Sequence, residues 1–154
     1  MNTEFSDARV KKKKGQQGKS AEAEVQAFLK KIDETTVEFD WHRGYDARAA
    51  GGKFQRVAGD FSFYWPQGHG IIEVKEIAKG ARLPYKNFTE SQVGKARKRE
   101  LAGGTVIVLI YVKDTDLWRR IPIDEFKHRP GPEFGSWDIS GYLAFPSVET
   151  ASGL

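Results

Sequence analysis

The chain has 154 residues, 39% of them hydrophobic and 30% charged, which fits one compact domain with a core of its own. It contains no cysteine, so disulfide bonds, thiolate catalysis and cysteine-ligated zinc are excluded. The longest apolar run, residues 106–112, is far too short to cross a bilayer. We therefore expect a soluble cytoplasmic protein with no membrane partner.

The positive charge is concentrated near the N-terminus. The formal net charge is +4, and residues 1–20 hold six basic and two acidic residues while the rest of the chain carries 19 of each. Such a charge favours a polyanionic partner. Residues 1–17 are expected to form a flexible basic arm, and its central residues are Lys11, Lys12, Lys13 and Lys14. The run fits a solvated arm and a DNA-contacting arm about equally well.

The first predicted helix begins after Ser20, a good N-cap residue. Apolar residues follow at helical spacing over about three turns, at Ala21, Val25, Phe28, Leu29 and Ile32. Glu22 and Glu24 flank this stripe, one on each side. They could be functional, or they could simply complement the helix dipole as first-turn acids. Spacing alone does not decide between the two.

Alternating polarity over residues 35–42 predicts a half-buried strand. Residues 43–56 contain glycines and basic side chains and are predicted to form a flexible loop before the next strand. Such a loop could close over a phosphate backbone, or it could be an ordinary surface connection.

A hairpin is predicted at the centre of the chain. Residues 57–65 and 71–76 are rich in β-branched and aromatic side chains, and residues 66–70 have turn composition. Side chains alternate between the faces of a strand, so Glu73 and Lys75 share one face. If the turn is centred near residues 66 and 67, Asp60 lies opposite Glu73 on that same face. A register shift of one residue would place it on the other face.

This arrangement has a chemical meaning. Two converging carboxylates beside an ammonium group suit a hard divalent cation such as Mg²⁺, which prefers oxygen ligands. Lys75 could then orient or deprotonate an attacking water, or stabilise the charge that develops on a phosphate. The hairpin therefore predicts a metal-dependent nuclease site.

A second helix is predicted over residues 90–101, because residues 89–92 match a capping box and Gly103 and Gly104 follow the helix. Residues 78–87 before it are expected to be irregular. Between positions 79 and 99 the chain has seven basic residues and one acid. Gln92, Lys95, Ala96 and Arg99 fall along one side of the helix. We favour phosphate contact over a merely solvated face, since the helix directly follows the Glu73 strand.

The C-terminal third continues the sheet. Residues 105–113 are almost uniformly apolar and predict a central strand buried on both faces. Residues 117–123 predict another strand, and Pro122 suggests that it lies at the sheet edge. Residues 124–128 could form one helical turn. Beyond them, Trp137, Tyr142 and Phe145 are expected to cover a face of the sheet or to form a dimer contact, and residues 149–154 to be a disordered tail.

The order helix, strand, hairpin, helix, strand resembles the core of the PD-(D/E)XK nuclease superfamily. Within it, residues 18–121 look like the Holliday-junction resolvases of the archaeal type, with some likeness to those of bacteria and phages. Three segments carry this resemblance besides Asp60 and the Glu73-Val74-Lys75 triplet: residues 18–24, with Glu22 as the helix glutamate, residues 48–51, with Arg48 in the loop, and residues 87–92, with Gln92. Residues 78–87 have no clear counterpart in these enzymes.

The resemblance implies an α/β, restriction-endonuclease-like domain over residues 18–148, with a central mixed sheet flanked by helices. It implies an intracellular phage or prokaryotic enzyme that makes paired, Mg²⁺-dependent nicks in four-way DNA junctions, leaving 5′-phosphates. Mn²⁺ is expected to substitute. A C2 homodimer would supply the two symmetric cuts.

The resemblance also implies roles for individual residues. The catalytic residues would be Glu22, Asp60, Glu73 and Lys75. The metal ligands would be Asp60, Glu73 and the Val74 carbonyl, with Glu22 acting through a metal-bound water or a second ion. The DNA-binding residues would be Lys11, Lys12, Lys13, Lys14, Arg48, Lys53, Gln92, Lys95, Arg97 and Arg99. Two other functions stay open, a restriction or repair nuclease acting on duplex or flap DNA and a non-catalytic DNA-binding protein.

Overall fold

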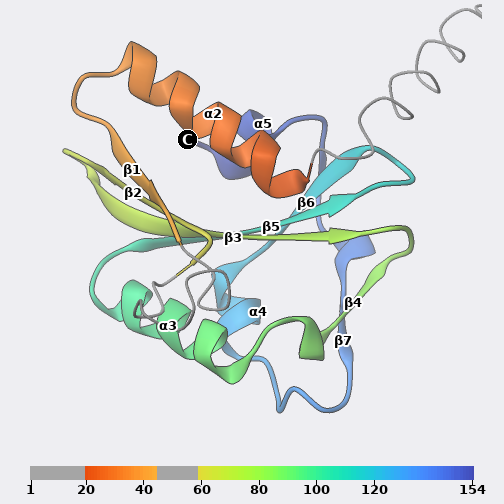
Figure 1. Cartoon of the computed structure of the whole chain (residues 1–154). Coiled ribbons are helices and arrows are strands. Elements are labelled where there is room, and N and C mark those ends of the chain that lie inside the picture. The colour runs from red at the N-terminus through yellow and green to blue at the C-terminus, as the bar shows by residue number, and fades with distance from the viewer. Residues whose placement is uncertain (1–19, 45–58) are drawn as a thin grey trace, which may run out of the picture.

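The computed structural model describes residues 20–44 and 59–154, which form an α/β fold with a central sheet between two layers (Figure 1). The predicted basic arm and the loop residues Arg48 and Lys53 lie outside these ranges. None of the helices in the described part of the chain is long and apolar enough to span a membrane.

The main sheet is mixed. In the described residues its strand order is β1 (Asp40–Arg43), β2 (Phe61–Trp65), β3 (Gly68–Ile77), β5 (Thr105–Val112), β6 (Leu117–Ile121) and β8 (Ala144–Phe145). Strands β3 and β5 run parallel, and the other neighbours are antiparallel. A small second sheet pairs β4 (Arg82–Pro84) with β7 (Ser136–Asp138). The parallel pair at the centre carries the Glu73 strand.

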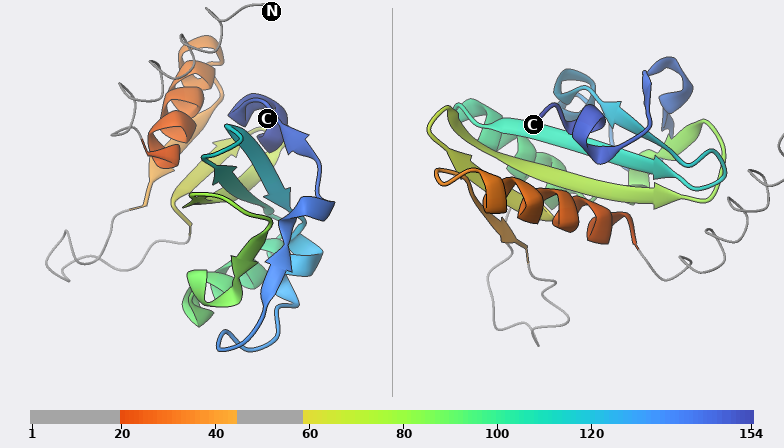
Figure 2. Two further views of the ribbon diagram at one scale, coloured as in Figure 1. Left: turned by 90° about the vertical axis from the view of Figure 1, so that its right-hand side faces the viewer. Right: turned by 90° about the horizontal axis from the view of Figure 1, so that it is seen from above.

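Helices cover both faces of the sheet (Figures 1 and 2). One face packs against α2 (Ala21–Thr35) and α5 (Val148–Ser152), through buried residues that include Val25, Leu29 and Ala151. The opposite face packs against α3 (Glu90–Leu101), α4 (Ile123–Lys127) and the small sheet. Ile72 and Val74 of β3 belong to the first core and Ile71 to the second, so the even and odd positions of this strand face different layers.

The hairpin register agrees with the prediction. Trp65 pairs with Gly68 and Phe61 with Ile72, so the turn is centred on residues 66 and 67 and Asp60 falls opposite Glu73. The turn is shorter than predicted, because β3 begins at Gly68 rather than at position 71.

The first helix and strand depart from the prediction at their junction. Ser20 caps α2 as expected, accepting from the Ala23 backbone N–H at 3.2 Å. The helix then continues to Thr35, and β1 begins only at Asp40, so the predicted strand over residues 35–42 is wrong in its first half. Val37 is 96% exposed. The alternating sequence pattern at Val37 therefore does not correspond to the buried face of a strand.

The second helix was predicted correctly. The Gln92 backbone N–H donates to the Thr89 hydroxyl at 3.1 Å, and the Thr89 N–H donates to the Gln92 side-chain carbonyl at 2.8 Å, which completes the capping box. The preceding segment is more regular than expected, since it contains β4 and a 3₁₀ turn, η1 (Tyr85–Asn87).

Strand β5 is central and buried, as predicted. Strand β6 is not an edge strand, because β8 pairs with its outer side. Pro122 lies after the last residue of β6 and at the N-cap of α4, where its missing N–H costs no sheet hydrogen bond. The predicted helical turn over residues 124–128 is confirmed as α4. Trp137 is buried against the α3 side of the sheet and so covers a face, one of the two predicted alternatives.

A short helix, α5, spans Val148–Ser152 in the segment for which a disordered tail was predicted over residues 149–154. Ser147 caps α5 by accepting from the Thr150 N–H at 3.3 Å, and Ala151 and Ser152 are buried. The Arg120 guanidinium donates to the Ser152 carbonyl at 2.8 Å and stabilises the C-terminal end of this helix. The sequence signal was missed because the helix is only five residues long.

Deletion of residues 148–154 should therefore destabilise the fold. It would uncover the core around Val148 and Ala151 and remove the acceptor of the half-buried Arg120, so we expect unfolding free energy to fall by about 2–4 kcal/mol in urea denaturation. The exposed Glu149→Ala change should have little effect. Equal stability of the truncated and full-length chains would show that α5 does not pack on the sheet in solution.

Candidate active site

Asp60 is held against β3 by two backbone interactions. Its N–H donates to the Ile72 carbonyl at 3.0 Å, and its carboxylate accepts from the Val74 N–H at 2.7 Å. Gly59 before it has φ +77°, and a Cβ at this position would lie 2.9 Å from that of Ile71. Glycine is therefore required at the bend that brings Asp60 to the strand.

Glu73 is the unusual member of the pair. The residue is 1% exposed, and neither carboxylate oxygen has a hydrogen-bond partner among the described residues. A buried carboxylate without donors is unfavourable unless it is protonated or bound to a cation. A buried carboxylate of this kind is typical of functional sites.

The pKa values reflect this burial. Burial and, to a smaller degree, the negative charge of Asp60 raise the pKa of Glu73 to about 8. Burial also raises the pKa of Asp60, and the charge of Glu22 adds to this, while the Val74 N–H works in the opposite direction. Without a cation the raised pKa of Glu73 favours its protonated form near neutral pH.

Lys75 supplies a positive charge on the same face of β3. Its ammonium lowers the pKa of both carboxyl groups, opposing the effect of burial. The Nζ atom lies 5.3 Å from the centre of the Phe88 ring. The predicted convergence of Asp60, Glu73 and Lys75 is thus present in the structure.

Glu22 lies near Asp60, but its carboxylate does not join the group formed by Asp60, Glu73 and Lys75. Its charge raises the pKa of Asp60, whereas that of Glu24 acts on Tyr111, so α2 presents Glu22 to the site and Glu24 elsewhere. The Glu22 carboxylate pairs with the Arg43 guanidinium at 3.1 Å. Among residues 20–44 and 59–154, no group of three or more His, Cys, Asp or Glu side chains is arranged to hold a metal.

Arg43 is a residue that the sequence analysis missed. It ends β1 and donates to Gln26 at 3.1 Å as well as to Glu22, so it holds the Glu22 side chain beside the site. Its only sequence signal was a basic residue at the start of a predicted loop. The pairing partner is 21 positions away and could not be identified from spacing.

The predicted DNA-binding residues of α3 differ in their surroundings. The charge of Lys95 lowers the pKa of Glu73, so Lys95 lies close to the carboxylates. Arg97 donates to the Lys127 carbonyl at 2.7 Å, and Arg99 donates to the His69 ring at 3.2 Å. Gln92 uses its side-chain carbonyl in the capping box. Of these four residues, Lys95 is therefore the one joined electrostatically to the site.

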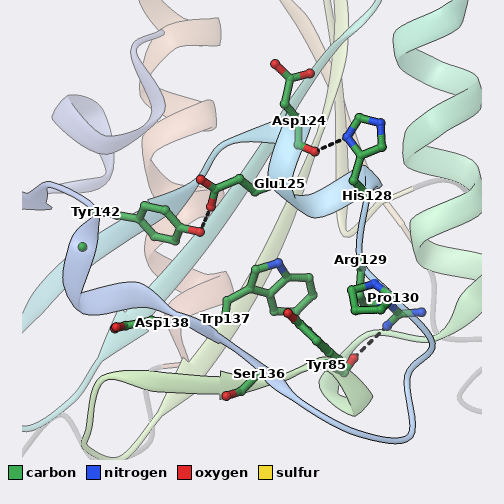
Figure 3. Close-up of a pocket in the computed structure, with 11 residues that line it drawn as sticks. Tyr85, Asp124, Glu125, His128, Arg129, Pro130, Ser136, Trp137, Asp138 and Tyr142 are labelled. Atoms are coloured by element: carbon green, nitrogen blue, oxygen red, sulfur yellow. Dashed lines mark hydrogen bonds between the residues drawn. The ribbon is translucent and has the colours of Figure 1, made fainter.

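A separate cavity of roughly 650 Å³ lies near the small sheet (Figure 3). Its lining includes Tyr85, Arg129, Trp137 and Tyr142, but none of the four predicted catalytic residues. The carboxylate pair therefore lies outside this cavity.

The fold has a counterpart among solved structures. The Holliday junction resolvase Hjc of Archaeoglobus fulgidus, an archaeal hyperthermophile, superposes with a TM-score of 0.54 at 19% sequence identity, covering 84% of this chain and 98% of that one. The two proteins share a fold. The predicted α/β fold is thereby confirmed, with a central mixed sheet flanked by helices. No protein-family model matches the chain, and no curated protein matches its sequence.

The residues present fit a divalent cation of the Mg²⁺ type. The donors are carboxylate oxygens, and those of Glu73 are buried and unpartnered within the described structure. A hard cation would replace the proton on Glu73 and relieve the repulsion between the two carboxylates. The chemistry of the donor set thus agrees with the metal predicted from sequence.

Stability should depend on pH through Glu73. The folded-state pKa of Glu73, about 8, exceeds its ordinary value of 4.5. Its contribution to the free energy of unfolding is therefore fully present below pH 4.5 and is lost as the pH rises to 8. In EDTA, Glu73→Gln should therefore be more stable than wild type at pH 8, by roughly 2–4 kcal/mol, with a much smaller difference at pH 4.5. Urea denaturation at both pH values measures this.

Two comparisons complete this test. Glu133→Gln, at an exposed position, should show no such pH-dependent difference. Adding Mg²⁺ at pH 8 should raise the melting temperature of wild type and not that of Glu73→Gln. A difference between Glu73→Gln and wild type that is the same at both pH values would contradict the buried-carboxylate interpretation.

Proposed function

We propose that this protein is a Mg²⁺-dependent, structure-selective endonuclease that resolves four-way DNA junctions. The observation that carries the proposal is the buried, unpartnered carboxylate of Glu73 opposite Asp60, with Lys75 on the same face of the strand. The shared fold with a Holliday junction resolvase supports the choice of substrate.

The residues would divide the work as follows. Asp60, Glu73 and the Val74 carbonyl would hold the metal, and Glu22 would contribute through a bound water or a second ion. When bound, the metal would act as a Lewis acid toward the scissile phosphate and lower the pKa of a water. The Val74 N–H fixes the orientation of the Asp60 carboxylate. Lys75 would position the attacking water or stabilise the charge developing on the phosphate.

Basic residues would neutralise the DNA backbone around this centre. Lys95 is joined electrostatically to Glu73, and Arg97 and Arg99 follow on the same helix. Arg43 is well placed to exchange Glu22 for a phosphate, since its side chain is half-exposed. The remaining members of the proposed set are Gln92, Arg48, Lys53, Lys11, Lys12, Lys13 and Lys14. A C2 homodimer would place two such sites for paired cuts.

Cleavage of a synthetic four-way junction tests the proposal. Purified protein with Mg²⁺ or Mn²⁺ should nick the junction in paired positions, and Asp60→Asn, Glu73→Gln and Lys75→Ala should each cut at least about 100-fold more slowly while still binding. Single-turnover rates on end-labelled strands, with binding followed by mobility shift, separate the two effects.

Controls define the alternatives. Glu133→Gln, at an exposed position, should cut like wild type. Equal cutting of a linear duplex or a flap would replace junction resolution by a general or repair nuclease function. A wild-type protein that binds the junction and never nicks it under either metal would be a non-catalytic DNA-binding protein.

Junction binding should depend on salt through α3. Lys95→Ala and Arg97→Ala should each weaken binding and reduce the slope of log Kd against log salt by about one, because each removes a phosphate contact. Lys30→Ala and Lys31→Ala, at exposed positions of α2, serve as matched controls of equal charge change. Identical slopes for the α3 and α2 variants would place the DNA on another surface.

A further inference from the structure

The ammonium of Lys75 lies over an aromatic ring. Its Nζ atom is 5.3 Å from the centre of the Phe88 ring, within the range of a cation–π interaction. Phe88 is fully buried, so its ring is shielded from water. We propose that Phe88 is a positioning residue that holds the Lys75 ammonium beside the carboxylate pair. This inference rests on the proposed nuclease function.

The ring is fixed by two other aromatic side chains. Phe126 of α4 meets it edge-to-face with ring centres 4.9 Å apart, and Trp137 of β7 does so at 5.8 Å. Phe126 and Trp137 in turn stack on each other at 5.6 Å. Three mutually packed rings leave Phe88 one orientation, because rotating any of them would open a gap or cause a clash.

The backbone that carries Phe88 is held by a buried arginine. The Arg129 side chain is 1% exposed, and its guanidinium donates to the carbonyl oxygen of Phe88. It also donates to the carbonyl oxygen of Tyr85 at 2.7 Å (Figure 3). It also pairs with Glu90, the first residue of α3, at 2.8 Å. Arg129 therefore ties the 3₁₀ turn, Phe88 and the start of α3 together as one rigid unit.

This support has a consequence for Lys75. A lysine has four rotatable side-chain bonds and would otherwise sample many positions around its Cα atom. The buried ring attracts the ammonium to one face and leaves its hydrogen atoms free to donate to a water or a phosphate oxygen. The aromatic cluster of Phe88, Phe126 and Trp137 thus restricts the position of the Lys75 ammonium. None of the three rings takes part in the reaction itself.

Graded fluorination of the Phe88 ring tests the proposal, because fluorine withdraws charge from the ring face while nearly keeping its shape. Single-turnover cleavage at saturating protein should slow stepwise with mono-, di- and trifluorophenylalanine at position 88, and Phe88→Leu should be about tenfold or more slower, with junction affinity unchanged. The same replacements at Phe39, buried in the other core, should not alter the rate.

A second readout needs no cleavage. In ¹³C-lysine NMR spectra, assigned with Lys75→Arg, the ε-methylene protons of Lys75 should show an upfield ring-current shift that disappears in Phe88→Leu. Wild-type cutting and resonance positions in Phe88→Leu, with Lys75→Ala inactive, would overturn this inference and leave the nuclease proposal intact. A wild-type protein that does not cut would overturn both.

Discussion

The burial of one carboxylate is the constraint around which the candidate site is arranged. Glu73 lies on β3 in the centre of the sheet, on the face that α3 covers, where Ile71 of β3 and Val108 of β5 are apolar neighbours. A glutamate at such a position destabilises a simple core, since a hydrophobic residue of similar volume would pack without a desolvation cost. Burial is the main cause of the raised pKa of Glu73, which reflects that cost.

Each neighbour of Glu73 comes from a different part of the fold. The hairpin register brings Asp60, the next odd position of β3 brings Lys75, and α3 brings the charge of Lys95. On the opposite side of the sheet, α2 presents Glu22, whose side chain is occupied by Arg43. The sheet thus fixes the carboxylate pair, and the helices on its two faces set the charges around it. The strands thus hold the carboxylate pair in place, while the exposed Glu22 and Arg43 side chains can exchange their ion-pair partners.

Local signals predicted the parts of the site that lie within one hairpin. The two-residue side-chain period and the turn composition were enough to place Asp60 opposite Glu73, and a capping box located α3. Sequence failed where partners are distant. The Glu22–Arg43 pair and the rings around Phe88 join residues from separate elements, so no spacing reveals them. The strand prediction also failed where polar and apolar residues alternate outside a strand, as at Val37, whose side chain faces solvent.

The C-terminal segment contributes to the surroundings of Lys75. The resemblance read from sequence ended at residue 121, yet Phe126, Arg129 and Trp137 all lie beyond it and support the face of the sheet on which Lys75 stands. In the proposed mechanism Lys75 needs a restricted ammonium, because a misplacement of about 1 Å would slow the reaction. Aromatic packing from α4 and β7 provides that restriction without adding a competing charge. The segment therefore belongs to the site by geometry, even though its own side chains hold no metal ligand in the proposed mechanism.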